Sequence, residues 1–408
     1  MLPQRIIIAN RTGLYRMKKK SFLQGALCGA LAMLLAAGLI FCGGKLNNDR
    51  RKNPAEAVEQ KLGELESLID ESYIHKVDEQ ELTEGIYKGY IAGLQDPYSA
   101  YYDKEETKEM YETSSGEFEG IGVLMSQDRE TGAITMVQVY EDSPAMKAGF
   151  QDNDILYKVE GEEVTGKDLS EVVSKIKGEK GTKVELTVLR GETAEEITAV
   201  VTRDKVEAQT VDYRMMADQI GYIAISEFDT VTYEQYKKAL EDLEAQGMKG
   251  LVVDLRNNPG GNLMTVCDML DLMLPKGPIV FTEDKGGHKE QIDSDEEHKF
   301  EKPMAVLTNG NSASASEIYA GAIQDYGIGE IVGTTTYGKG VVQQVFDLKD
   351  GTSLKLTVAE YFTAKERSID GKGIVPDVEV EYEANLEDPT ADNQLNRAVE
   401  VVKEKITK

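Results

Sequence analysis

Residues 304–326 read MAVLTNGNSASASEIYAGAIQDY, and the prediction of the fold rests on this stretch. Its apolar start, 304–308, predicts a buried strand, the small polar residues after it predict a loop, and 316–326 predict a helix. The same alternation precedes it, with strands expected at 220–225 and 250–255 and helices at 233–246 and 264–274. This order favours an α/β core with a largely parallel sheet over residues 204–385.

Three unusual loops follow strands of this core, at 256–261, 311–317 and 337–340. Sites in open α/β sheets cluster at the carboxyl ends of the strands, which is where these loops are expected. In the second loop, small side chains would let a substrate backbone approach. Free amides at the start of the next helix would be donors for an oxyanion.

The second loop contains three serines, Ser312, Ser314 and Ser316. Each is a candidate nucleophile, and each is also a candidate helix cap. We assign the cap to Ser316, because Glu317 follows it as an acid of the first turn. Spacing alone does not choose the nucleophile among the three.

Other catalytic chemistry fits the chain poorly. The segment 333–339 satisfies most of a phosphate-binding P-loop pattern, but Gly340 replaces the magnesium-binding hydroxyl and the flanks read as strands. The chain has only His75, His288 and His298, none in an H-E-x-x-H pattern, and no cysteine pair has zinc spacing. A Ser-His-Asp triad therefore has no support, and we expect no metal and no organic cofactor.

A serine peptidase without histidine needs another base, and a lysine can serve if it is neutral. Its pKa must then fall by about three units, at a cost on the order of 4 kcal/mol. Lys339 lies between two glycines beside apolar segments, where the backbone can deliver an amine into a crowded site. Most lysines are surface charges, so this position alone does not establish a base.

The first 20 residues hold six basic side chains and no acid, and Phe22–Gly44 follows without a charge. This apolar run is long enough for the roughly 30 Å hydrocarbon core of a bilayer. We expect a transmembrane anchor at 21–44, a cytoplasmic tail at 1–20, and the protease body on the extracytoplasmic side of the cell membrane. A cleaved signal peptide and a lipid-modified Cys42 are the alternatives.

The rest of the chain divides into regions with different patterns of apolar residues. Residues 55–112 read as helical, with apolar residues at three- and four-residue steps, and they are a plausible dimer arm. Residues 113–203 read as a compact, mostly β unit with one helix at 168–177, and 386–408 as a C-terminal helix. The formal net charge of −27 argues against nucleic acid as a partner. Cys267, the one cysteine far from the apolar segment, is expected to be a buried, inert thiol.

Five motifs occur in the order found in one protease family. They are Asp254-Leu-Arg-Asn-Asn-Pro-Gly-Gly261, Ser312-Ala-Ser-Ala-Ser-Glu-Ile318, Gln324-Asp-Tyr-Gly327, Gly338-Lys-Gly-x-x-Gln343 and Gly373-Ile-x-Pro-Asp377. With Phe118-x-Gly-Ile-Gly122 and Ser143-Pro-Ala-x-x-Ala-Gly149, they make residues 55–408 resemble the carboxyl-terminal processing proteases. The resemblance implies an α/β protease core with crotonase/Clp-protease-like layers and a β extension. It also implies an inserted PDZ domain at 113–203.

The resemblance also assigns roles in a serine endopeptidase. Ser314 would be the nucleophile, Lys339 the general base, and Gln343 the residue that orients this lysine. The amides of Ala315 and Gly260 would bind the oxyanion. A catalytically inactive PDZ scaffold, or a membrane adaptor that presents peptides to another protease, is the alternative.

The PDZ domain would recognise the C-terminal region of protein substrates. Its loop of Gly120, Ile121, Gly122 and Val123 would offer amides to the terminal carboxylate. The basic stretch 177–182 lies where such a domain couples to a protease core.

Asp325 lies 11 residues after Ser314, roughly 16 Å along a helix axis. That separation makes direct contact between the two side chains implausible, although this acid is sometimes grouped with the catalytic residues. We therefore interpret Asp325 as a structural acid.

Overall fold

The computed structural model describes residues 54–407 except 192, 296–298, 385–387 and 389–390. These residues fall into two compact units, 54–86 and 87–407, and each is described by itself. The expected basic tail and anchor, 1–20 and 21–44, lie outside the described residues. Within the described part, no helix combines the length and the apolar composition that a membrane span requires.

The first unit is helical, as its apolar spacing predicted. Helix α2 covers Pro54–Ser72, and α3, Glu79–Ala92, continues into the second unit. The residues that carried the prediction are not buried, since Val58, Leu65 and Leu68 are about half exposed. Periodicity therefore identified the helix correctly, but not what covers its apolar face.

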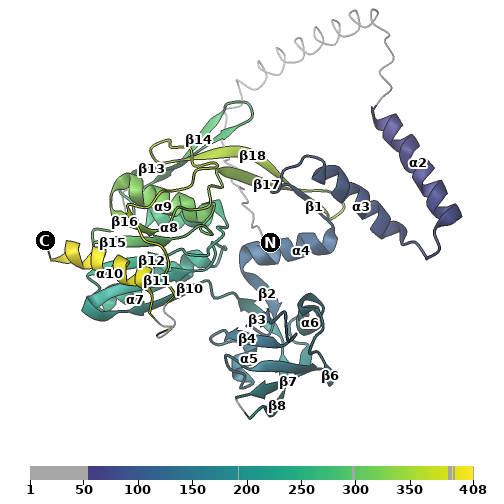
Figure 1. The fold of residues 1–408 in the computed structure, drawn as a ribbon, viewed down its shortest axis with the longest axis horizontal. Coiled ribbons are helices and arrows are strands. Elements are labelled where there is room, and N and C mark those ends of the chain that lie inside the picture. The colour runs from purple at the N-terminus through teal and green to yellow at the C-terminus, as the bar shows by residue number, and fades with distance from the viewer. Residues whose placement is uncertain (1–53, 192, 296–298, 385–387, 389–390, 408) are drawn as a thin grey trace, which may run out of the picture. The chain divides into compact units, whose positions relative to one another are not determined.

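The core is the predicted α/β layer (Figure 1), built on a six-stranded sheet. Its strands, in sheet order, are β10 (Val211–Met215), β11 (Ile220–Ile225), β12 (Gly250–Asp254), β15 (Met304–Thr308), β16 (Gly329–Gly333) and β19 (Val378–Glu379). All neighbours are parallel except β10 and β11, which the 3₁₀ turn η1 (Ala217–Gln219) connects. The sheet is therefore largely parallel, as predicted.

Both faces of this sheet are buried, which explains the nearly continuous apolar strands. One face packs against α7 (Thr232–Ala245), α8 (Leu263–Asp271) and α9 (Ala315–Tyr326). The other face packs against the C-terminal helix α10 (Asn393–Ile406). Neighbouring residues alternate between the faces, so that Val253 faces α7 and Val252 faces α10.

A second, antiparallel sheet forms the β extension of the core. It consists of β1 (Ala100–Tyr102), β18 (Ser353–Thr363), β13 (Gly277–Asp284), β14 (Lys289–Ser294) and β17 (Val341–Asp347), the last paired with β18. Strand β1 was not expected within 55–112, which was predicted as a helical region. It pairs with residues about 250 positions later, a contact that local periodicity does not show. Helix α4 (Lys104–Ser115) begins directly after β1, capped by Asp103.

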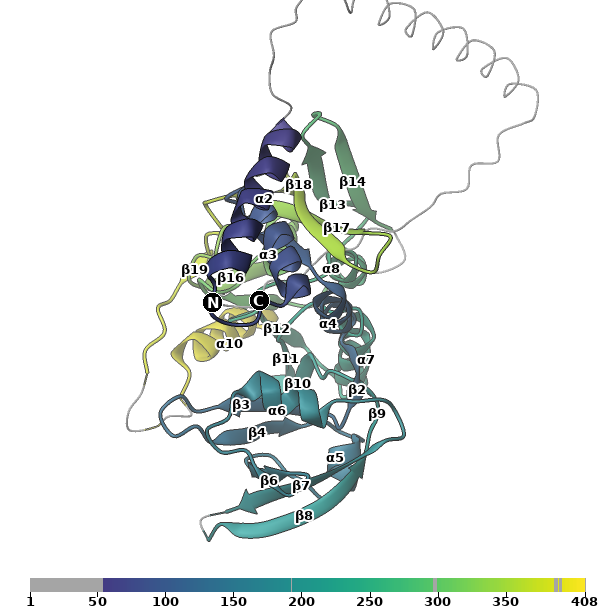
Figure 2. The ribbon, with the colours of Figure 1, turned by 90° about the vertical axis from the view of Figure 1, so that its right-hand side faces the viewer.

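Residues 117–207 form the compact β unit expected between 113 and 203. Strands β2 (Glu117–Gly120) and β9 (Asp204–Glu207) pair at its base. Figure 2 shows the main sheet of the unit below these two strands. It consists of β3 (Val123–Gln127), β4 (Ile134–Val139), β5 (Ile155–Val159), β6 (Glu162–Glu163), β7 (Lys183–Arg190) and β8 (Glu195–Thr202). Helices α5 (Pro144–Lys147) and α6 (Leu169–Ile176) complete the unit. Val172 and Ile176 of α6 are buried in its own hydrophobic core, as the apolar spacing predicted.

Candidate active site

Ser314 lies at the junction between the serine loop and α9. Its φ of 55° and ψ of −114° are unusual for a residue with a side chain. The helix begins at Ala315, so Ser314 occupies the N-cap position, and its amide donates to Glu317 Oε2 at 2.8 Å. The prediction that Ser316 is the cap was therefore wrong.

The other two serines of the loop have structural partners. Ser312 Oγ donates to the carbonyl of Leu255 at 2.8 Å, and Ser316 Oγ donates to that of Asn258 at 3.0 Å. Both hydroxyls thus fasten the serine loop to the turn after β12. Ser316 does not cap the helix because it already lies in the first helical turn. Ser314 Oγ donates to no carbonyl of the described residues. The hydrogen bonds therefore distinguish Ser314 from the other two serines, which sequence spacing alone could not do.

The turn 258–261 lies directly against Ser314. A Cβ added to Gly260, whose φ is 102°, would lie 2.7 Å from Ser314 Cβ and 2.9 Å from the Ala315 amide nitrogen. The close approach agrees with a role beside the nucleophile. However, the Gly260 amide donates to Asn258 Oδ1 at 2.8 Å. Of the two expected oxyanion donors, the Gly260 amide is thus engaged within its own turn.

Lys339 lies in the loop between β16 and β17, and its side chain is only 5% exposed. Its Nζ lies 4.7 Å from the centre of the Tyr98 ring, and no hydrogen bond joins it to Ser314. Catalytic hydrogen bonds are often formed only in the complex with substrate. Burial, and then the charge of Lys355, lower the pKa of Lys339 to about 8, against opposing effects of Glu317 and Asp96. At pH 7 roughly a tenth of this amine is therefore neutral, far more than at its ordinary pKa of 10.5.

One buried carboxylate, Glu317, joins the loops of Ser314 and Lys339. Its Oε2 accepts the amides of Ser314 and Lys339 at 2.8 and 2.9 Å. Its Oε1 accepts the Gly338 amide at 2.7 Å and the Thr336 hydroxyl at 2.6 Å. Burial raises the pKa of Glu317, and these hydrogen bonds oppose the rise. The sequence suggested only a first-turn acid here and not a link between the two loops.

A second buried lysine, Lys355 on β18, was missed altogether. It is 4% exposed, and its Nζ lies 5.2 Å from the centre of the Tyr102 ring. Burial lowers its pKa to about 8. Ser353, Lys355 and Thr357 alternate with apolar residues, which reads as a solvent-facing row. Strand β1 pairs with this part of β18 and brings the Tyr102 ring against the Lys355 amine, a contact that the composition of β18 does not show.

Among the described residues, neither Gln343 nor Asp325 is hydrogen-bonded to Ser314 or Lys339. Gln343 is buried on β17, and its Nε2 donates to Val341 O at 3.4 Å and Thr357 Oγ1 at 3.3 Å. Asp325 accepts the Lys365 amide at 2.8 Å and forms an ion pair with Arg367 at 2.6 Å. The structural interpretation of Asp325 agrees with these bonds.

The loop of Gly120, Ile121, Gly122 and Val123 lines a cavity of about 260 Å³, together with Phe118 and the α6 residues Val173 and Ile176. A neighbouring cavity of about 420 Å³ shares Phe118 and Lys177 with it and extends to Asn257 and Pro259. Lys177 forms an ion pair with Glu112 of α4 at 3.2 Å. Hollow surface thus runs from the expected carboxylate loop to the turn beside Ser314.

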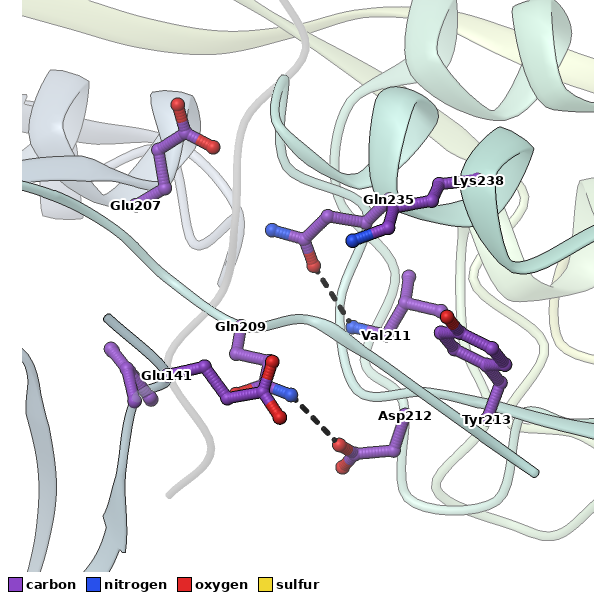
Figure 3. A pocket seen from close by; sticks show the side chains of 9 residues that line it. Glu141, Glu207, Gln209, Val211, Asp212, Tyr213, Gln235 and Lys238 are labelled. Atoms are coloured by element: carbon purple, nitrogen blue, oxygen red, sulfur yellow. Dashed lines mark hydrogen bonds between the residues drawn. The ribbon is translucent and has the colours of Figure 1, made fainter. Parts of the chain in front are cut away.

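A third cavity, of about 530 Å³, lies near the junction of the β unit and the core (Figure 3). Its lining includes the acids Glu141, Glu207 and Asp212, and Gln209 donates to Asp212 at 3.2 Å. Neither Ser314 nor Lys339 lines it, so we do not regard it as the active site.

Metal chemistry finds no site among the described residues, since no group of three or more His, Cys, Asp or Glu residues is arranged to hold an ion. Cys267 is buried, as expected, and burial raises the pKa of its thiol.

Family profiles match three consecutive parts of the chain. Residues 42–106 match the Activating protease CtpB N-terminal domain, 135–190 the PDZ domain, and 219–380 Peptidase family S41. The Carboxy-terminal processing protease CtpB of Bacillus subtilis is 38% identical over 324 residues, covering 78% of this chain and 67% of that protein. The Carboxy-terminal processing protease CtpA of the same organism is 39% identical over 322 residues, covering 79% and 68%.

Among solved structures, an S41 protease of Bacteroides fragilis has a TM-score of 0.53 at 18% identity, covering 82% of this chain and 91% of that one. The fold and the matched profiles define a serine-type peptidase with an S41 core and a PDZ domain. The chain belongs to the carboxy-terminal processing protease family. The 117–207 unit is hereafter called the PDZ domain.

Proposed function

We propose that this protease cleaves its substrates with a Ser-Lys dyad formed by Ser314 and Lys339. The observation that carries the proposal is the buried Glu317 carboxylate, because a single oxygen accepts the backbone amides of both residues. The strained backbone of Ser314 and the lowered pKa of Lys339 support the same assignment.

In this mechanism, neutral Lys339 accepts the proton of Ser314 Oγ as the oxygen attacks the substrate carbonyl. The tetrahedral oxyanion is bound by the Ala315 amide at the start of α9. The Gly260 amide can join it only if its hydrogen bond to Asn258 opens. Lys339 then returns the proton to the leaving amine, and a water, deprotonated by Lys339, hydrolyses the acyl-enzyme. Gln343 holds Thr357 beside this pocket and supports the lysine indirectly.

Cleavage of casein by the purified full-length chain tests the dyad. We expect Ser314→Ala and Lys339→Ala each to abolish hydrolysis while unfolding cooperatively, as the wild type does. Ser316→Ala is the matched control and should remain active, because its hydroxyl only fastens the loop. Activity retained in Ser314→Ala would exclude the assignment, and a wild-type chain that cleaves nothing would favour the inactive scaffold or adaptor.

We further propose that the PDZ domain binds the C-terminal segment of a substrate through Gly120, Ile121, Gly122 and Val123. The cavities that connect this loop with Pro259 support the proposal, since they give a bound chain a path toward Ser314. Competition between a protein substrate and peptides with a free or an amidated C-terminus tests it. Equal inhibition by both peptides would contradict carboxylate recognition.

The N-terminal parts lead to two further proposals. Residues 21–44 anchor the chain in the cell membrane with the protease body outside the cytoplasm, as the charge asymmetry of the sequence suggests. Protease accessibility in intact and opened spheroplasts tests this orientation. The exposed apolar residues of α2, including Leu65 and Leu68, are covered by a second copy of the chain. Leu68→Asp should then reduce the mass measured by light scattering from that of a dimer to that of a monomer.

A further inference from the structure

Two buried lysines, Lys339 and Lys355, both lie against one segment of the chain, 96–102. Their side chains are 5% and 4% exposed, and each Nζ lies over a tyrosine ring, of Tyr98 and Tyr102 respectively. Among the ion pairs of the described residues, neither lysine has a carboxylate partner within 4.0 Å. Buried cations without a paired acid are rare, because burial penalises the charged form.

Sheet pairing places Lys355 on the same face of the sheet as Gln343, the residue that supports the proposed dyad. Thr357, two residues further on β18, is opposite Gln343 of β17 and accepts its side-chain hydrogen bond. Residues two apart on a strand point to the same face, so Lys355 shares this face. Lys339 lies just before β17, and the charge of Lys355 is the second cause, after burial, of its lowered pKa.

An acid acts on the same two lysines from a different part of the chain. Asp96 accepts the Tyr98 amide at 3.0 Å and the Ser99 hydroxyl at 2.5 Å. Ser99 Oγ in turn accepts the Thr357 amide at 3.1 Å, which fastens the segment 96–102 to β18. The charge of Asp96 opposes the lowering of the pKa of both Lys339 and Lys355.

We propose that Lys355 and Asp96 are opposed positioning residues that set the protonation state of the base, Lys355 favouring the neutral amine of Lys339 and Asp96 its ammonium form. The inference rests on the proposed function, in which Lys339 is the base. Neither residue touches the reacting atoms, and both act through the charge they present to Lys339.

The groups around the two lysines show why this pair is the informative one to vary. They are Lys355 and Tyr361 from β18, Asp96, Tyr98 and Tyr102 from the segment 96–102, Glu106 from α4, Glu317 from α9, and Tyr337 and Asp370 from neighbouring loops. Glu317 and Asp370 also accept backbone amides of the loop that carries Lys339, at 2.9 Å from Lys339 and 3.2 Å from Gly340. Replacing either would move that loop. Lys355→Met removes no hydrogen bond of that loop, and Asp96→Asn keeps the side-chain oxygen that accepts the Tyr98 amide.

The experiment measures how fast a serine-reactive fluorophosphonate labels Ser314 in the full chain as a function of pH. Labelling requires the base to be neutral, so the acidic limb of the plot of labelling rate against pH follows the protonation of Lys339. Neighbouring charges change a pKa by about one to three units, so we expect Lys355→Met to move the limb up by about one unit. Well below the limb this corresponds to roughly tenfold slower labelling. Asp96→Asn should move the limb down. Lys349→Met removes an exposed lysine of the β17–β18 turn and should move nothing.

Opposite shifts in the two variants are the signature that a merely structural role would not produce. If both variants lowered the maximal rate and left the limb in place, the inference would be wrong. Lys355→Arg retains the positive charge, so its acidic limb should lie at the wild-type pH. If Lys355→Met unfolds, the limbs of Lys355→Arg and Asp96→Asn still test the inference. Wild-type labelling of Lys339→Ala would instead refute the proposed function. An unreactive Lys339→Ala combined with unmoved limbs would refute only this inference.

Discussion

Replacing Lys339 by methionine should make the protein inactive and, near neutral pH, more stable. Methionine has a similar length and no charge, so it removes the cost of keeping an ammonium group in a dry pocket. Burial lowers the pKa of Lys339 from 10.5 to about 8. Each unit of such a shift corresponds to about 1.4 kcal/mol, so the free energy of unfolding should rise by about 3 kcal/mol in Lys339→Met.

The lowered pKa of Lys339 also predicts how the stability difference between the two chains changes with pH. Between about pH 8 and 10.5 the unfolded chain still binds the proton that folded Lys339 has released. The stability contributed by this residue therefore rises with pH across that window. The advantage of Lys339→Met should be full below about pH 8 and should disappear as the pH approaches 10.5.

Urea denaturation followed by tyrosine fluorescence measures the difference, with both chains carrying Ser314→Ala so that self-cleavage cannot contribute. Lys349→Met in the same background removes an exposed charge and should leave the free energy of unfolding within about 0.5 kcal/mol of its parent. A Lys339→Met chain that is less stable near neutral pH, or a stability gain that does not narrow with rising pH, would refute the reasoning.

Three further substitutions test individual contacts. Glu317→Gln replaces one carboxylate oxygen by an NH₂ group, which then faces two of the four hydrogen-bond donors. The free energy of unfolding, measured by urea denaturation, should therefore fall by about 3 kcal/mol, and kcat/KM for casein should fall as well. Gly260→Ala puts a Cβ 2.6 Å from the Ala313 carbonyl oxygen and should lower kcat/KM about 100-fold. Gly149 has a similar φ but no heavy atom within 4 Å of an added Cβ, so Gly149→Ala is the control and should leave kcat/KM unchanged. Gly122→Ala puts a Cβ 2.5 Å from Ser143 Cβ and should raise KM for a protein substrate while sparing a short peptide. Equal effects on both substrates would contradict the peptide-binding role.

The parallel core could be predicted because burial on both faces leaves a local signature. Every residue of β12 is buried, and its sequence is correspondingly apolar, so five residues suffice to indicate a central strand. The two helices that follow β11 and β15 lie within one or two residues of their predicted bounds. Helix α8 ends at Asp271, three residues before the predicted end.

The parts that sequence reasoning missed depend on contacts between distant segments. The strand β1 exists because residues 100–102 pair with 353–355. Its two tyrosines favour a strand, but three residues are too few to show an alternating pattern. The cap of α9 was misassigned because the helix begins at Ala315, so Ser316 lies within its first turn and its hydroxyl donates to the Asn258 carbonyl of another loop. Lys355 was not singled out for the same reason, since the strand whose Tyr102 ring lies against its amine is about 250 residues earlier in the chain.

The way in which this site obtains a neutral base explains why so many distant segments meet there. A histidine has an ordinary pKa of about 6.5 and can serve as a base at neutral pH on the surface of a cleft, whereas a lysine must be sequestered from water. Burial is the largest cause of the lowered pKa of Lys339, and the ring of Tyr98 forms part of the wall that excludes water. Because that wall belongs to the segment 96–102 and not to the loops of Ser314 and Lys339, hydrating the pocket through this segment would return the pKa of Lys339 toward 10.5 while Ser314, Ala315 and Glu317 remained in place. The basicity of Lys339 is therefore a property of the closed tertiary structure, which the loop sequence around it does not encode.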